Sequence, residues 1–185
     1  MKDQRPEYER LIAPISDRMI RVVWRIVRDP DEAEDTFQEA LLTVWKRWGQ
    51  IQSHPNPHAL ILRICVHCAQ DTLRRRVRRE KRIDADGVPE AVADTTPSAV
   101  QRLAGAEQGA EVLRAIGTLS RNQSQAILMH VVEEVPYGDI AAAMDCGEAT
   151  VRKHVARARA KLRTLLAHLI PQVTKEEGIH AQHEA

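Results

Sequence analysis

The sequence predicts an all-α protein with two small helical domains, and three observations support this fold class. Aromatic residues make up only 3% of the 185 residues, so Leu, Ile, Val and Ala must build the cores, which favours helices over sheets. Apolar residues recur at helical spacing and no alternating strand pattern occurs. A segment rich in Asp, Ala, Thr and Pro, residues 84–97, separates two helical stretches and is typical of a linker.

The first domain, residues 1–83, begins with two predicted helices. The first reaches about Arg28, bends near Pro14, and has an apolar stripe of Leu11, Ile12, Ile15, Met19, Val22, Val23 and Ile26. For the second helix, Asp29 supplies an N-cap, Pro30 the first helical position and Glu32 a capping-box acid. Its stripe is Phe37, Leu41, Val44 and Trp48. We expect Gly49 to end it in a left-handed conformation.

A third helix follows a polar loop, residues 50–55. Asn56 and Pro57 form another cap and first-turn pair. The helix passes from apolar residues into a strongly basic block, residues 74–82, in which seven of nine residues are Arg or Lys. We therefore predict a helix that is buried at its start and cationic at its end.

The second domain, residues 98–171, contains four predicted helices. The first covers residues 98–116, and a capping box of Ser120 and Gln123 begins the next, which reaches about Glu133. A short helix at 136–144 and a long one at 148–169, stopped by Pro171, complete the domain. Residues 172–185 show no periodicity, and we predict a disordered tail.

The last two helices form a predicted helix-turn-helix, carried by the sequence PYGDIAAAMDCGEATVRKHVARARAKLR. Ile140, Met144, Val151 and Val155 supply its small core. The opposite side of the second helix carries the cations Arg152, Lys153, His154 and Arg157 among small alanines, which suits phosphate contacts and base-edge readout. The alternative is a solvated basic face, but the preceding helix and turn favour DNA binding.

Charge is strongly segregated although the net charge is only +1. Residues 29–39 hold six acids and no base, whereas residues 152–163 hold six bases and no acid. Such blocks indicate different partners at different places. The alternatives are a solvated acidic face near a helix N-terminus and a solubilising basic tail.

From Tyr8 to Leu166, the chain resembles the extracytoplasmic-function (ECF) group of bacterial RNA polymerase sigma factors. The first-domain residues that carry the resemblance are DPDEAEDTFQEALLTVWKRW and ILRICVHCAQDTLRRR. Those of the second domain are AIGTLSRNQSQAILMHVVEEVPYGDIAAAMDCGEATVRKHVARARAKL. The resemblance implies a factor that binds core polymerase and directs promoter recognition and transcription initiation, with its first domain on the -10 element and its second on the -35 element.

The resemblance also implies site residues and partners. Core polymerase is expected at Asp35, Gln38, Glu39, Leu42 and Trp45. The -10 element is expected at Gln52, Ser53, His54, Asn56, Arg63, His67, Asp71, Arg74, Arg75 and Arg78. The -35 element is expected at Ala149, Thr150, Arg152, Lys153, His154, Arg157 and Lys161. The implied partners are the clamp helices of the largest polymerase subunit, the flap of the second, promoter DNA and, as a further candidate, an anti-sigma factor.

The sequence departs from the family's pattern in several places. Leu60 stands where the family usually has Trp, and no aromatic residue occurs between Gly49 and Pro136, so base stacking has no candidate there. We therefore expect any flipped base to be held near the loop of residues 50–56 by polar groups such as Gln52, Ser53, His54 or Asn56, although polar loops are also ordinary connections. Asp145 replaces a turn Gly and Ser120 a Pro, and both residues suit their positions.

Other functions find little support. Cys65, His67 and Cys68 are too few ligands for a metal site, so buried thiols are the simpler interpretation, and Cys146 is assigned to packing. We expect no cofactor and no enzymatic activity, because no phosphate loop or nucleophile motif occurs. No apolar run is long enough to span a membrane and no signal peptide is evident, which predicts the bacterial cytoplasm. The alternative function is a helix-turn-helix regulator with an N-terminal dimerisation or sensor domain.

Overall fold

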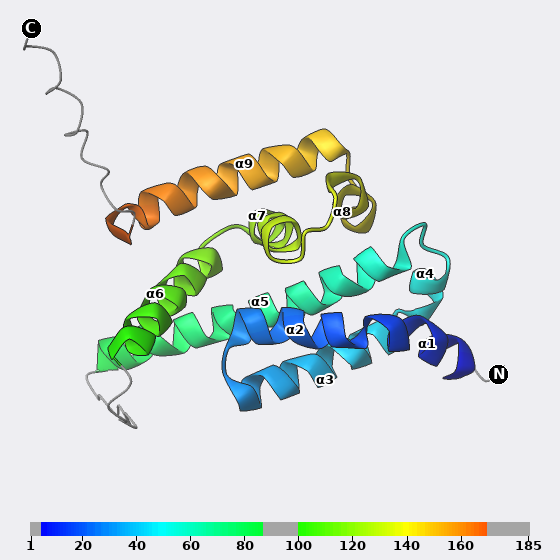
Figure 1. Cartoon of the computed structure of the whole chain (residues 1–185), viewed down its shortest axis with the longest axis horizontal. Coiled ribbons are helices and arrows are strands. Elements are labelled where there is room, and N and C mark those ends of the chain that lie inside the picture. The colour runs from blue at the N-terminus through cyan, green and yellow to red at the C-terminus, as the bar shows by residue number, and fades with distance from the viewer. Residues whose placement is uncertain (1–4, 87–99, 170–185) are drawn as a thin grey trace, which may run out of the picture.

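The computed structural model describes residues 5–86 and 100–169, and every element in these ranges is helical. The long helix α5 (Pro57–Asp86) runs through the middle of the molecule (Figure 1). The N-terminal helices α2 (Ser16–Val27) and α3 (Pro30–Lys46) pack against it, and α7 (Arg121–Ile127) and α8 (Tyr137–Met144) of the C-terminal part also contact it. The predicted all-α fold is confirmed.

The first predicted helix bends where proline was expected to bend it. Helix α1 (Arg5–Ile12) passes into a 3-10 turn, Ala13–Ile15, which contains Pro14, and α2 then follows. Arg28 ends α2 in a left-handed conformation with φ 58°. The Asp29 carboxylate then accepts a hydrogen bond of 2.9 Å from the backbone N–H of Glu32, which confirms the N-cap of α3. The Glu32 side chain pairs with Arg76 of α5.

Gly49 does not end the second helix as predicted. Helix α3 stops at Lys46, and the backbone N–H of Arg47 closes its last turn on the carbonyls of Thr43 and Val44. Burial of the Trp48 side chain then anchors a new short helix, α4 (Trp48–Gln52), which includes Gly49 and part of the predicted loop. The chain turns at Arg47 with φ −100°, so no left-handed residue is needed there.

Helix α5 begins where the sequence predicted, because the Asn56 side chain accepts a hydrogen bond of 3.0 Å from the N–H of Ala59. It is 30 residues long, or about 45 Å at the α-helical rise. It continues through the basic block to Asp86, past the predicted start of the linker at residue 84. The rest of the predicted linker and the predicted tail lie outside the described residues.

The C-terminal part follows the predicted order with two local differences. Helix α6 (Val100–Gly117) is followed by α7, whose capping box of Ser120 and Gln123 is present. The predicted helix to Glu133 instead changes at Leu128–Val132 into a π-helical turn, closed by the N–H of Glu133 on the Leu128 carbonyl. Helix α9 (Glu148–Leu165) ends before residue 169, and a 3-10 turn, Ala167–Leu169, completes the predicted span.

The apolar core joins the two predicted domains. One cluster of buried side chains extends from Met19 of α2 and Ile61 of α5 to Met129 of the π-turn and Ile140 of α8. Leu119, Ile127 and Ala158 form a smaller cluster beneath α9. The domains are therefore in apolar contact. None of the helices in residues 5–86 and 100–169 combines the length and the apolar character needed to cross a membrane.

Candidate nucleic-acid interface

The helix-turn-helix of α8 and α9 is held by a buried seam and a tight turn. Ile140, Val151 and Val155 are almost fully buried between the two helices. Asp145 ends α8 in the left-handed conformation with φ 52°, and the N–H of Cys146 donates a hydrogen bond of 3.0 Å to the Ala141 carbonyl. Asp tolerates this conformation better than most residues. The seam and the turn fix the orientation in which α9 presents its outer face.

The residues predicted for the -35 element lie mainly on the outer face of α9. Arg152, Lys153 and Arg157 are exposed, and His154 is half-buried. Also exposed are Ala149, Thr150 and Lys161. The Lys161 ammonium donates a hydrogen bond of 2.9 Å to the Thr118 carbonyl before α7, so it also ties α9 to its neighbour. The outer face is therefore a smooth, cationic helix surface.

Arg152 forms contacts within the protein that were not predicted from the sequence. Its guanidinium pairs with Glu148 one turn earlier and lies 4.6 Å from the centre of the Tyr137 ring. The spacing of four residues between Glu148 and Arg152 was the available signal for the ion pair. Both contacts hold the guanidinium beside the N-terminus of α9, where recognition helices meet bases.

The side of α5 predicted to meet the -10 element contacts the C-terminal domain. Arg63 donates hydrogen bonds of 2.6 Å to the Ala143 carbonyl and 3.3 Å to the Gln125 side chain. Arg74 donates a hydrogen bond of 2.8 Å to the Leu119 carbonyl. Burial lowers the pKa of both guanidinium groups. These two cations are thus partly withdrawn from solvent.

The remaining charged residues of this set pair with neighbouring side chains of α5, α3 and α7 or are exposed. The His67 ring lies 3.4 Å from Asp71, whose carboxylate also pairs with Arg121 of α7 at 3.1 Å. Burial lowers the pKa of His67. Arg75 is exposed and donates a hydrogen bond of 2.8 Å to the Thr72 hydroxyl, and Arg78 is exposed.

Four polar side chains before α5, those of Gln52, Ser53, His54 and Asn56, form hydrogen bonds within the protein. Gln52 donates a hydrogen bond of 2.6 Å to Glu7 of α1, and the Ser53 hydroxyl donates to the Gly49 carbonyl. The Nδ1 atom of His54 accepts from the N–H of Asn56, and its Nε2 atom lies 3.1 Å from the Ala142 carbonyl of α8. Of the predicted base-holding groups, Asn56 serves as a helix cap and His54 as a bridge between the domains.

The residues predicted for polymerase binding share one exposed face of α3. Asp35, Gln38 and Glu39 are exposed, and the face continues through two apolar side chains, Leu42 and Trp45, that are 59% and 44% exposed. Large apolar side chains this open to solvent mark candidate interaction surfaces when they cluster. The face combines acidic groups with an apolar end.

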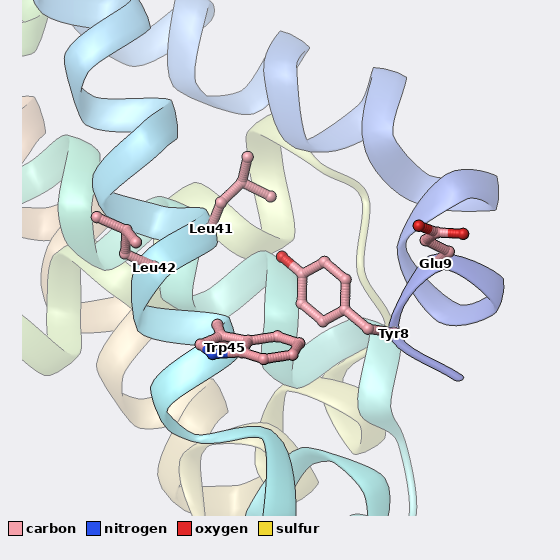
Figure 2. Close-up of a pocket in the computed structure, with 5 residues that line it drawn as sticks. All are labelled: Tyr8, Glu9, Leu41, Leu42 and Trp45. Carbon is pink, nitrogen blue, oxygen red and sulfur yellow. The ribbon is translucent and has the colours of Figure 1, made fainter. Parts of the chain in front are cut away.

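A hollow of about 400 Å³ adjoins this apolar end (Figure 2). Tyr8 and Glu9 of α1 and Leu41, Leu42 and Trp45 of α3 line it. The Tyr8 ring packs edge-on against Trp45, with ring centres 5.2 Å apart. The contribution of α1 to this surface was not predicted from the sequence. Tyr8 and Trp45 of α3 are far apart in the sequence, so no local sequence pattern predicts their contact.

The cysteines are free thiols. Cys65 and Cys68 are buried, and Cys146 is half-buried. Burial raises the pKa of both buried thiols, to about 11 for Cys68. Within residues 5–86 and 100–169, no group of three or more His, Cys, Asp or Glu side chains is arranged to hold a metal ion.

Two all-helical domains, one ending in a helix-turn-helix with a cationic outer face, define a DNA-binding protein, and comparisons with known proteins show its family. The model of sigma-70 region 2 matches residues 11–79, and that of sigma-70 region 4 matches residues 109–162. The ECF RNA polymerase sigma factor SigC of Mycobacterium tuberculosis is 31% identical over 140 residues, which cover 74% of this chain and 73% of that protein.

Two further comparisons agree with this result. The probable RNA polymerase sigma factor RfaY of Xanthomonas campestris pv. campestris is 26% identical over 86% of this chain, which spans 40% of the length of that protein. The sigma factor RpoE of Bartonella quintana, solved in complex with the anti-sigma factor NepR, has the same fold with a TM-score of 0.52. It is 24% identical, and the match covers 87% of this chain and 97% of that one.

The chain belongs to the ECF RNA polymerase sigma factors. Its function is that of a sigma factor, which directs polymerase to promoters in transcription initiation.

Proposed function

We propose that this chain binds core RNA polymerase through the exposed face of α3, and promoter DNA through α5 at the -10 element and α9 at the -35 element. The observation that carries the proposal is the α3 face, where all five residues predicted for polymerase binding are exposed together. A DNA-binding regulator needs no such face beside its basic helices. The chain then acts by recruitment and catalyses no reaction itself.

The α3 face has the chemistry of a protein interface. At its apolar end, Leu42 and Trp45 lie beside Tyr8. Aromatic residues such as Trp and Tyr contribute most of the binding energy when a partner excludes water from them. Its acidic end, Asp35 and Glu39, suits a basic partner surface and speeds encounter with it. We assign the clamp helices of the largest polymerase subunit to this face, and the flap of the second subunit to the C-terminal domain.

The two proposed DNA surfaces, on α9 and on α5, both carry exposed cations. The outer face of α9 is exposed, so Lys153 and Arg157 are open to phosphates and base edges. On α5, Arg75 and Arg78 are exposed at the cationic end and suit phosphate contacts.

We place promoter binding in the bacterial cytoplasm. An anti-sigma factor is a further candidate partner, as the resemblance to the family implies.

Run-off transcription with sigma-free core polymerase and a promoter library tests the function. We expect specific transcripts that depend on both core and this chain. A protein that binds DNA yet neither binds core nor supports initiation is instead the alternative, a helix-turn-helix regulator.

A paired substitution tests the α3 face. Leu42→Ala removes an exposed apolar side chain from this face and is expected to weaken core binding about ten-fold, because interface centres lose more than about 1 kcal/mol on truncation. Ile20→Ala removes an apolar side chain that is 36% exposed on α2 and should leave core binding unchanged. Equal binding by the wild type and Leu42→Ala in a fluorescence titration contradicts the assignment.

A further inference from the structure

The ring of Tyr137 joins the two helices of the helix-turn-helix. Tyr137 is the first residue of α8 and is half-buried. The Arg152 guanidinium of α9 lies 4.6 Å from the centre of this ring, within the range of a cation–π contact. The His130 ring stacks on the same Tyr137 ring, with ring centres 4.1 Å apart and 28° between the planes. An arginine of α9 therefore rests on an aromatic pair from outside that helix.

The chain before α8 is shaped so that His130 meets Tyr137. His130 lies in the π-turn, and such turns are rare and frequent at functional sites. Glu134 then turns the chain in the left-handed conformation, with φ 52°. The N–H of Val135 donates a hydrogen bond of 3.0 Å to the Met129 carbonyl, and the Nδ1 atom of His130 lies 3.4 Å from the Val135 carbonyl. These contacts restrain the His130 ring, and through it the Tyr137 ring.

Glu148 restrains the same guanidinium from a second direction. Its Oε1 atom accepts hydrogen bonds from two nitrogens of Arg152, from Nε at 3.2 Å and from Nη2. A guanidinium has five N–H donors in a fixed, planar arrangement. The Nη1 group of Arg152 forms no hydrogen bond within residues 5–86 and 100–169, and the side chain is 61% exposed. Arg152 is thus held in place while part of its donor set is open to a ligand.

The contact with Tyr137 places the Arg152 guanidinium on the α8 side of α9. In a helix-turn-helix bound to DNA, the first helix crosses the sugar-phosphate backbone and the second lies in the major groove. A guanidinium held against the first residue of α8 therefore lies on the backbone side of the recognition helix. The acceptors on that side are phosphate oxygens, which a guanidinium binds through two N–H groups at once.

We propose that Tyr137 and His130 are positioning residues for DNA recognition. They hold the Arg152 guanidinium in the orientation that binds one backbone phosphate, and this contact sets the register of α9 in the major groove. A restrained arginine loses less side-chain entropy on binding than a mobile one. Arg157 keeps the base-reading role. The inference rests on the proposed function, because it takes α9 as the surface for the -35 element.

A double-mutant cycle measures whether Tyr137 acts through Arg152. Fluorescence anisotropy gives the affinity of the full chain for a duplex that the wild type selects from random sequences. Tyr137→Leu keeps an apolar side chain but removes the aromatic face, so it should weaken binding about two- to five-fold, the value of an exposed cation–π contact. In the Arg152→Ala background the same substitution should have no effect. An equal loss in both backgrounds overturns the proposal.

Three further variants separate this role from packing. Tyr137→Phe retains the ring and should bind like the wild type, so a loss as large as that of Tyr137→Leu overturns the aromatic contact. His130→Leu removes the stacked ring and should weaken binding only where Arg152 is present. The matched control is Arg159→Ala, on the α6 side of α9. Its effect and that of Tyr137→Leu should be independent, and a coupling as large as that with Arg152 overturns the specific role.

Single methylphosphonate substitutions in the same duplex identify the acceptor, because they remove the charge of one phosphate at a time. One of them should weaken binding of the wild type several-fold and leave binding of Arg152→Ala unchanged. Tyr137→Leu should show a reduced effect at the same phosphate. Replacement of guanines by 7-deazaguanine, which lacks the N7 acceptor, should affect the wild type and Arg152→Ala alike. An effect of 7-deazaguanine that disappears in Arg152→Ala overturns the phosphate assignment in favour of a base contact.

NMR tests the wild type directly, so the result does not depend on whether a variant folds. The heteronuclear NOE of the Arg152 Nε–H group, assigned by its loss in Arg152→Lys, should approach the values of the backbone, and that of Arg157 should be much lower. Equally low values overturn the restraint. If the wild type binds its selected duplex but the cycle shows no coupling, only this inference has failed. If the wild type selects no duplex, the proposed DNA surface has failed, and the NOE still reports whether Arg152 is held.

Discussion

Arg157→Ala is the substitution that best tests how α9 recognises DNA. Arg157 is exposed on the outer face, away from the seam formed by Val151 and Val155. Its removal should therefore leave stability within about 0.5 kcal/mol of the wild type. A guanidinium that reads a base edge contributes about 1–3 kcal/mol, which corresponds to a roughly 5- to 150-fold loss of affinity.

The effect of Arg152→Ala should be smaller. Arg152 already holds an ion pair with Glu148 and a position over the Tyr137 ring. An exposed ion pair contributes about 0.2–1 kcal/mol, and an exposed cation–π contact about 0.5–1 kcal/mol. If Arg152 breaks either contact to bind DNA, the free energy of the lost contact offsets part of the free energy gained from the DNA contact. We therefore expect Arg157→Ala to weaken binding more than Arg152→Ala does.

Fluorescence anisotropy with a promoter duplex that contains the -35 element measures both variants at several salt concentrations. Arg159→Ala is the matched control, because it removes the same charge from the same helix beside Leu162 and Val112 on the α6 side. Wild-type affinity of Arg157→Ala at physiological salt refutes the assignment. An equal loss in Arg159→Ala shows that only overall charge attracts the DNA.

Three further predictions concern stability and reactivity. Asp29→Ala removes the cap of α3 and should cost about 1 kcal/mol, measured by urea unfolding against Asp31→Ala as control. Burial raises the pKa of Glu133, so its folded form binds protons more readily than its unfolded form and stability is lost as pH rises through the folded pKa. Glu133→Gln removes this pH dependence, so its stability relative to the wild type should increase as the pH rises above the ordinary carboxyl pKa of about 4.5; a difference that stays constant with pH contradicts the burial argument. Iodoacetamide near pH 8 should modify Cys146 before Cys65 and Cys68, whose burial raises the pKa of their thiols, and equal labelling in mass spectrometry shows otherwise.

The order of helices was predictable because local signals mark their ends. Asp29, Asn56 and the Ser120–Gln123 pair each form the cap that their spacing indicated. These contacts join residues three positions apart, so the sequence contains all that they require. The same holds for Asp145, whose short polar side chain tolerates the left-handed turn.

The prediction for Gly49 was wrong because a tertiary contact decided the outcome. Glycine is a good helix terminator in isolation, but burial of Trp48 against the core favours another helical turn at that place. The π-turn at Leu128–Val132 was not predicted either, and it directly precedes Glu133, which pairs with Arg18 across the domains. Neither contact has a short-range signature.

The candidate binding surfaces were likewise predictable where they depend on one helix, and not where they depend on contacts between the domains. Outward-facing residues of a single helix, such as those of α3 and α9, follow from helical spacing. The pairing of Arg63 with Ala143, and of Asp71 with Arg121, depends on how two domains meet. Charge segregation identified cations on α5 but could not show which of them the protein itself neutralises.

The apolar cluster that runs from Met19 through Ile61 to Ile140 also determines how the chain unfolds. Two domains with separate cores melt independently, whereas domains that share buried side chains lose part of each core when either one opens. Heat or urea should therefore unfold the free chain in a single cooperative transition. Bound to a partner that parts the domains, each domain should respond to destabilising substitutions on its own.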